Sequence, residues 1–251
     1  MKRLAYAALA CVALPAPARA YRPFNSTDAA VAGRGEIELE VGPAGFLEEG
    51  SDRWLVAPAL ILNWGFARDW EAVLEARHLI RLGAVGSGRR LSVEDAALSL
   101  KTVLRDGVLQ EGSGVSVASE LSALLPSVDG ETGAGLEGAV IVSQRWEAVT
   151  LHLNGAAAWT RAHVPGFFTG LIAEGHDAWA IRPVAEVFVE GERDVPTTFS
   201  GLAGAIWRVR DNLSVDAGLR LARAGDVSIM EIRAGFTWAF ALGWPTLRRK
   251  R

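Results

Sequence analysis

Cysteine is nearly absent from this chain: Cys11 is the only one in 251 residues. It lies inside an N-terminal stretch with the pattern of an export leader, so the mature chain would contain no cysteine. Small secreted domains that cannot build a large core are commonly held together by disulfides. The lack of cysteine excludes a scaffold of that kind.

Long apolar runs are also missing after the leader, although half of the residues are hydrophobic. No later segment approaches the roughly 18 uninterrupted apolar residues of a membrane-spanning helix. Two classes of exported protein combine these properties. One is a well-packed soluble β protein, and the other is an outer-membrane barrel whose apolar residues alternate with polar residues facing the lumen.

The chain has no excess of basic charge and no cofactor motif. Its 26 Lys and Arg residues stand against 29 Asp and Glu, which does not favour a nucleic-acid partner. The glycine runs at 83–88 and 130–138 are not followed by a helical pattern, and no Cys or His cluster has the spacing of metal ligands. The sequence therefore predicts no cofactor, no metal site and no nucleic acid.

The first 20 residues, "MKRLAYAALACVALPAPARA", have the three parts of a secretory signal peptide. Lys2 and Arg3 give a charged head, 4–14 an apolar run and 18–20 an A-x-A cleavage signal, so the mature chain would begin at Tyr21. An uncleaved membrane anchor would need a longer apolar run. Export out of the cytoplasm is the expected outcome.

Alternating segments recur from residue 35 onward, each close to the 9 to 11 residues that a tilted membrane strand needs. Twelve are predicted, at 35–41, 54–64, 70–82, 91–104, 114–125, 135–145, 148–160, 167–174, 179–190, 198–209, 213–223 and 228–240. The even count suits a closed barrel over 35–240. It would be preceded by a periplasmic segment at 21–34 and followed by a basic tail at 241–251.

The connections between these segments are of two kinds. Tight polar turns such as 67–69 and 210–212 alternate with mostly longer, glycine-rich loops such as 42–53 and 126–135. Short periplasmic turns and longer outer loops are typical of outer-membrane barrels. Two exceptions are the long inner turn at 106–114 and the short eighth segment.

Alternation alone fits both a membrane barrel and a soluble sandwich, so another feature must distinguish them. The positions of the tryptophans provide it. Trp54 and Trp64 are ten residues apart, which projects to about 25 Å on a tilted strand, the height of a barrel's apolar band. A sandwich would instead collect tryptophans at mid-strand positions in its core. The predicted membrane-interface aromatics are Trp54, Trp64, Trp70, Trp146, Trp159, Trp179, Trp207 and Trp238. We therefore predict an all-β, antiparallel transmembrane barrel of about 12 strands.

The stretch "RAGFTWAF" (233–240) matches the C-terminal insertion signal of outer-membrane proteins through Arg233, Gly235, Trp238 and Phe240. The usual signal ends the chain, whereas a short basic tail follows here. The chain also resembles the family of outer-membrane transporters named after the meta-cleavage pathway of phenol degradation. The resemblance lies in the stretches 23–40, 65–76, 184–193, 204–220 and 231–240. It implies a barrel that passes or accepts small, often apolar compounds, and it brings no site residues.

Charged and polar side chains on the other face of the strands are expected to line the lumen. They are Glu36, Glu38, Glu40, Glu71, Glu75, Arg77, Arg81, Lys101, Glu120, His152, Arg182, Glu186, Arg208, Arg220, Glu231 and Arg233. Their signs are nearly balanced. Such a set either closes the lumen as a lattice of ion pairs or forms a mixed-charge pore lining.

These features predict a porin-like transport protein of a Gram-negative outer membrane, acting as a passive channel or uptake protein for small molecules, hydrophobic ones among them. The expected partners are outer-membrane lipids, the barrel-assembly machinery during insertion and a small solute. A closed structural or lipid-binding barrel is the main alternative. A phospholipase-type enzyme, with Ser92 on the strand next to His78, is a weaker one, because no third residue is fixed by the spacing. The chain is not expected to be an enzyme.

Overall fold

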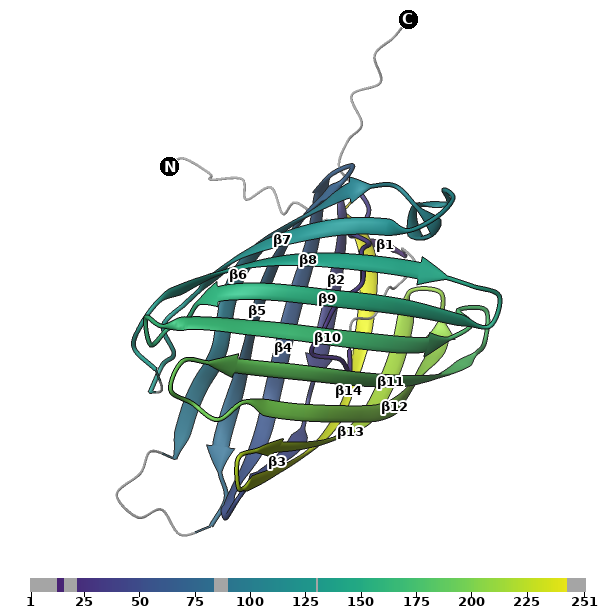
Figure 1. The fold of residues 1–251 in the computed structure, drawn as a ribbon. Coiled ribbons are helices and arrows are strands. Elements are labelled where there is room, and N and C mark those ends of the chain that lie inside the picture. Colours follow the sequence, from purple (N-terminus) through teal and green to yellow (C-terminus); the bar gives the residue numbers. More distant parts are fainter. Residues whose placement is uncertain (1–12, 16–21, 84–89, 130, 243–251) are drawn as a thin grey trace, which may run out of the picture.

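The alternating segments of the sequence form long strands with one face buried and the other exposed. A computed structural model describes residues 13–15, 22–83, 90–129 and 131–242 (Figure 1). Within them every neighbouring pair of strands is antiparallel, and the order in the sheet follows the order in the chain. The prediction of a twelve-stranded antiparallel barrel is confirmed.

The observed strands agree closely with the predicted segments. They are β2 Glu36–Gly42, β3 Gly45–Glu49, β4 Asp52–Ala67, β5 Trp70–Arg81, β6 Leu91–Arg105, β7 Ser116–Leu124, β8 Gly135–Arg145, β9 Val149–Trp159, β10 Pro165–Gly175, β11 Ile181–Glu192, β12 Thr198–Arg210, β13 Leu213–Ala224 and β14 Val227–Leu242. β2 and β3 follow each other along β4 and together make the first barrel strand. The prediction of an outer loop at 42–53 is therefore wrong, because β3 lies within that stretch and continues the first strand past a break. The predicted eighth strand, at 167–174, is longer in the structure and has the length of its neighbours.

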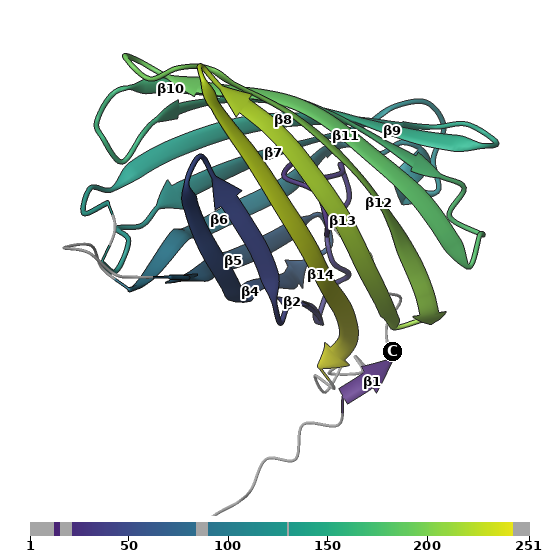
Figure 2. The ribbon, with the colours of Figure 1, turned by 90° about the horizontal axis from the view of Figure 1, so that it is seen from below.

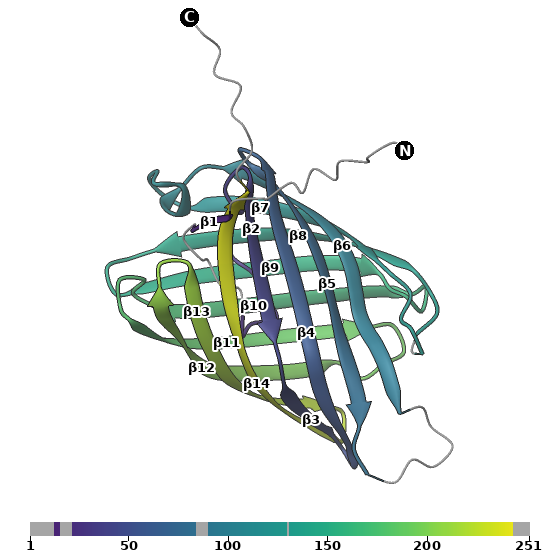
Figure 3. The ribbon, with the colours of Figure 1, turned by 180° about the vertical axis from the view of Figure 1, so that it is seen from behind.

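The last strand closes the ring against the first. β14 pairs with β13 on one side and with β2 and β3 on the other (Figure 3). A closed ring leaves no open sheet edge, which a barrel in lipid requires. A short extra strand, β1 (Ala13–Pro15), pairs with the end of β14 at Phe240–Leu242 (Figure 2). Most of the predicted leader, and residues 243–251 of the predicted tail, lie outside the described residues.

A break in the wall separates β2 from β3. The register of both strands on β4 places Pro43 opposite Pro58. Neither proline has an N–H to donate, so the ladder is interrupted at this point. The pairing of β4 with β5 also shifts by a residue between Val56 and Ala59, which is the signature of a β-bulge.

The bulge overturns one predicted interface aromatic. Before it, Trp54 and Val56 share the inward face, whereas after it Ile61 and Asn63 do. Trp54 packs against the buried cluster of Leu47, Val56 and Leu79. It therefore does not share a face with Trp64, and the spacing of these two rings does not measure a membrane.

The other seven predicted interface aromatics are exposed on the outer surface. Trp64, Trp70, Trp146, Trp159, Trp179, Trp207 and Trp238 are each between 40% and 53% exposed. Along β14 the alternation follows the expected parity: Gly235, Thr237 and Ala239 are buried, and Trp238 is exposed. Large apolar side chains such as Leu153 and Leu219 stand outward between the ends of their strands. This surface is apolar enough to face lipid.

The long inner turn at 106–114 contains a 3-10 helix, η1 (Val108–Gln110), the only helix among the described residues. In that part of the chain no helix is long and apolar enough to cross a membrane. Leu109 of η1 packs with Ala29, Ala30, Ala118 and Ile141 in a small buried cluster. The turn is long because it packs onto residues inside the barrel.

Candidate functional site: a lumen divided by the N-terminal segment

Residues 22–34, called here the N-terminal segment, lie inside the barrel. The sequence predicted a periplasmic segment at 21–34, but in the structure Arg22, Ser26, Ala29, Ala30 and Ala32 are buried. Their contacts are with inward-facing side chains of strands from β2 to β14. The small residues of "NSTDAAVAG" allow the segment to pass close to the wall.

Backbone amides fix the segment to the wall. Six N–H groups donate to side-chain oxygens of five residues spread around the ring: Arg22 to Glu40 (3.1 Å), Asn25 and Ser26 to Glu186 (2.9 and 2.7 Å), Thr27 to Asn154 (3.1 Å), Ala29 to Ser143 (2.9 Å) and Ala32 to Glu71 (2.5 Å). Wall groups also donate in return, Asn154 Nδ2 to Thr27 O at 2.8 Å and Gln110 Nε2 to Ala29 O at 2.9 Å. Buried backbone groups outside a strand ladder need other partners, so these bonds help to determine the path of the segment.

Arg22 sits where β14 meets the broken first strand. Its Nη2 donates to Ala234 O at 3.3 Å, and its Nε lies 3.5 Å from Asp216. A Cβ on Gly42 or Gly235 would overlap the guanidinium. Both glycines therefore leave the space that the arginine occupies, and Gly235 has this second role beside its place in the predicted insertion signal.

Gly65 of β4 makes the corresponding space at the inner end of the barrel. A Cβ there would overlap the carbonyl oxygens of Ala32 and Gly33. The neighbouring Gly35 N–H donates to Gly65 O at 2.6 Å. The chain thus passes from the lumen into β2 over a wall position where only glycine fits.

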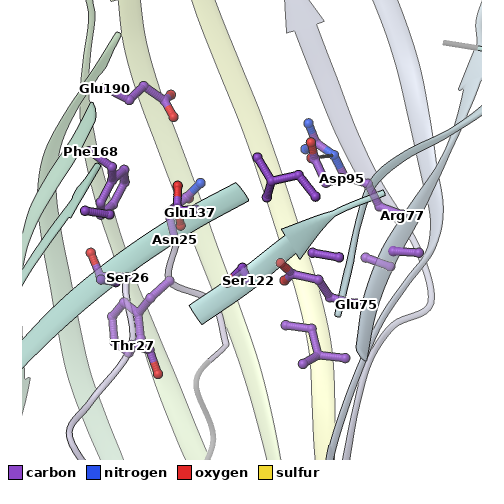
Figure 4. A pocket seen from close by; sticks show the side chains of 18 of the residues that line it. Asn25, Ser26, Thr27, Glu75, Arg77, Asp95, Ser122, Glu137, Phe168 and Glu190 are labelled. Carbon is purple, nitrogen blue, oxygen red and sulfur yellow. Dashed lines mark ion pairs between the residues drawn. The ribbon is translucent and has the colours of Figure 1, made fainter. Parts of the chain in front are cut away.

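The segment separates two cavities. The outer one has a volume of about 630 Å³ and reaches the outer loops at Arg161 and Val195. The inner one, of about 440 Å³, lies among the inner turns at Asp177 and Arg208. They share no lining residue: Asn25, Ser26 and Thr27 belong to the outer chamber, whereas Asp28 and Ala30 belong to the inner one (Figure 4).

The predicted lumen residues fall into three groups in the structure. Those lining the outer chamber are Glu71, Glu75, Arg77, Lys101, Glu120, Glu231 and Arg233. Those lining the inner chamber are His152, Arg182 and Arg208. The remainder line neither chamber: Glu36 and Arg81, which are partly exposed, and Glu38, Glu40, Glu186 and Arg220, which are buried. Asn63, Asn154 and Ser143, which were not predicted, hold the segment or its partners.

The basic groups of the lumen are engaged. Arg233 lies 2.6 Å from Glu231, and Arg220 lies 3.1 Å from Glu190 and 3.6 Å from Glu231. Arg77 bridges β6 and β14 by pairing with Asp95 at 2.5 Å and Glu231 at 3.7 Å. Apart from Arg233–Glu231, which lies within β14, these pairs join different strands, as in the lattice of ion pairs that was one of the two alternatives for the lumen charges. Paired charges in a confined lumen are costly to break, because removing one partner leaves the other uncompensated.

The inner chamber contains a second, smaller network. His152 Nδ1 is 2.8 Å from Ser143 Oγ, and its Nε2 is 3.5 Å from Glu174, which also lies 3.4 Å from Arg182. No cluster of His, Cys, Asp or Glu in the described residues could hold a metal ion. His152 therefore acts as a hydrogen-bonding residue beneath the segment.

Ser92 and His78, the pair on which the phospholipase-type alternative depends, are not arranged as a catalytic pair. Ser92 Oγ donates to Glu94 at 2.9 Å, and Ser92 is buried. His78 stands opposite Val93 in the register of β5 on β6. Among the described residues no hydrogen bond joins Ser92 to His78, so the pair lacks the base contact that a serine nucleophile needs.

Solved structures share this architecture. The COG4313 outer membrane channel from Pseudomonas putida F1 aligns with 86% of this chain and 100% of its own, with a TM-score of 0.64 and 9% identity. The NanC porin gives 0.57 at 8% identity over 80% and 98%, and the KdgM porin gives 0.53 at 9% identity over 81% and 98%. The fold is that of outer-membrane channel barrels. No protein-family model and no curated protein matches the chain, so the predicted membership of the phenol meta-pathway family stays a prediction.

Proposed function

We propose that this chain is a passive channel or uptake barrel for small solutes in a Gram-negative outer membrane. The observation that carries the proposal is the divided lumen: two cavities, one at each end of a closed barrel, separated by the N-terminal segment. A purely structural barrel of this size would be expected to fill its lumen with side chains. The barrel fold and the fold of its solved neighbours support the proposal.

Three other features support a location in the outer membrane: the leader, the end of β14 and the outer face of the barrel. The leader would direct export, and the end of β14 would serve the barrel-assembly machinery during insertion. The exposed aromatic and aliphatic outer face suits contact with outer-membrane lipids. The interface role of the seven exposed tryptophans and the insertion role of Arg233, Gly235, Trp238 and Phe240 are parts of this proposal.

A closed barrel is the second candidate, and the N-terminal segment favours it. Six amide hydrogen bonds and the Lys101–Asp28 contact at 3.7 Å hold the segment across the lumen. If it never moves, solutes cannot pass from the outer to the inner chamber. The two candidates therefore differ in whether water and ions pass beside the seated segment.

Planar-bilayer conductance of the exported, detergent-purified protein separates them. We expect a small conductance from the unmodified protein, and a larger one when the segment is loosened by Asn154→Ala together with Ser143→Ala. Neither substitution removes a charge, so a change in conductance would reflect movement of the segment rather than a change in the electrostatic potential of the lumen. If neither protein conducts, although each is shown to be folded and inserted, the result would contradict the channel and favour the closed barrel.

A further inference from the structure

The outer chamber has an excess of acidic groups that the lattice does not neutralise. Nine acidic and five basic side chains line it. The basic ones are already held: Arg22 by Asp216, Arg77 and Arg233 by Glu231, and Lys101 by Asp28. Arg161 donates instead to the carbonyl oxygens of Leu125 and Ala96, each at 2.8 Å.

Three carboxylates of the chamber have no such partner. The side chains of Glu75 (β5), Glu120 (β7) and Glu137 (β8) make no hydrogen bond or ion pair with any residue that the structure describes. Glu75 and Glu137 line the same cavity as Asn25 and Thr27 of the segment (Figure 4). Like charges in one confined cavity repel, and a cation between them relieves the repulsion.

Glu71 gives an independent indication at the floor of the chamber. Its side chain is fully buried, and its Oε2 accepts the Ala32 N–H. Its Oε1 has no hydrogen-bond partner among the described residues, although the residue lines the cavity. A buried acceptor without a donor is costly. An ammonium group, with three N–H donors and no acceptor, would satisfy it.

The form of the chamber argues for an organic cation rather than a bare metal ion. The carboxylates are too dispersed to make a metal site, since no ligand cluster occurs among the described residues. Between them lie apolar side chains, Val73, Leu124, Ala139 and Ala156. A volume of about 630 Å³ is within the range of small-molecule sites.

An aromatic ring completes the site. Phe168 lines the chamber and packs on Phe188, with ring centroids 5.4 Å apart. Arg220 covers Phe188 at 4.9 Å, so that ring already has its cation. Phe168 is left to contact a ligand, and a ring face attracts a cation.

We propose that the outer chamber binds small organic ammonium compounds, with Glu75, Glu120 and Glu137 supplying the charge and Phe168 the aromatic contact. This proposal names a substrate class for the proposed channel. Binding of the compound needs only the outer chamber, whereas its passage across the membrane rests on the proposed channel function. The acids that set the preference are then on β5, β7 and β8. They are not Glu36, Glu38 and Glu40, of which the last two are buried within the wall.

Calorimetric titration of the purified protein in detergent tests the site with three probes of one shape. Benzylammonium should bind at least about tenfold more tightly than neutral benzyl alcohol, and benzoate should not bind. Replacing Glu75, Glu120 and Glu137 together by Gln should weaken benzylammonium at least about tenfold and leave benzyl alcohol unchanged. Phe168→Leu should weaken it about two- to fivefold.

The matched control removes three charges from exposed positions outside the chamber, Glu49→Gln, Glu147→Gln and Asp211→Asn. It should leave benzylammonium binding unchanged. Equal affinity for the three probes, or equal loss in the control, would overturn the proposal. Because the three lumen acids are unpaired, their replacement should not lower the temperature at which the folded band disappears on a gel, and each single variant should still show a partial loss of binding.

Conductance distinguishes this proposal from the one on which it rests. A protein that binds benzylammonium but never conducts would refute the channel and keep the chamber's specificity. A protein that conducts, yet shows no binding preference and no cation preference in its reversal potential, would refute the specificity and keep the channel.

Discussion

Gly65 shows how much of the lumen's arrangement depends on single atoms. A Cβ at this position would overlap the backbone oxygens of Ala32 and Gly33, which cannot move without the segment moving. Gly65→Ala should therefore displace the inner end of the segment. We expect a rise in bilayer conductance and faster cleavage of residues 22–34 by an added protease.

Gly138 provides the matched control, because a Cβ there meets nothing within 4 Å. Gly138→Ala should leave both conductance and cleavage as in the unmodified protein. If Gly65→Ala also left conductance and cleavage unchanged, the position of the segment would not depend on its close contact with Gly65.

Glu186 is the strongest single anchor, because it accepts two consecutive backbone N–H groups, from Asn25 and Ser26. Replacing it by Ala leaves both donors without this acceptor, and the one from Ser26 is buried. The loss should lower the free energy of unfolding by about 1 to 3 kcal/mol. Urea titration of the detergent-solubilised barrel measures the loss. Glu186→Gln retains one acceptor oxygen, so a loss as large as that of the alanine variant would show that charge, rather than hydrogen bonding, holds the segment.

At the scale of the element, strands were the most predictable feature. Period-two alternation is a local property, so the predicted segments overlap the observed strands, and all but the first differ by only a few residues at their ends. The first was predicted to end at 41, but β3 continues it to Glu49. The local pattern could not predict which side chains face outward on the far side of a β-bulge. Trp54 was assigned outward by counting back from Trp64, and the extra residue between Val56 and Ala59 reverses that count. Pro43 and Pro58 were the only visible signs of the irregularity.

The lipid face of β4 gives a test at this scale. Leu60, Leu62, Trp64 and Phe66 all stand outward, with Leu60 near mid-strand and Phe66 near the inner end. Leu60→Arg should lower the free energy of unfolding in lipid by about 2 to 4 kcal/mol, and Phe66→Arg by about 0 to 1. The same cost at both positions would contradict a membrane on this face.

At the scale of the molecule, a closed ring of twelve strands is expected to resist detergent as a unit. Far-UV circular dichroism should show β structure with little helix. Unboiled protein should migrate differently from boiled protein on a denaturing gel. Substantial helix, or identical migration of the two samples, would contradict the barrel.

The lumen was less predictable than the wall, for a physical reason. Which residues face inward follows from alternation, but which of them meet depends on strand register and on what lies inside. The acceptors for the N-terminal segment, such as Glu71 and Glu186, are far apart in sequence and become neighbours only through closure. The stretch 22–34 has no alternation of its own, so nothing local distinguished an external tail from an internal segment.

The path of residues 22–34 also sets an order of events in time. This stretch precedes β2 to β14 in the chain and is synthesised before them, yet its binding groups are contributed by strands from Glu40 in β2 to Ala234 in β14. It cannot reach its final position until the last strand has joined the first. Lodging of the segment would thus mark the completion of assembly, and every partly inserted intermediate would carry an unoccupied interior.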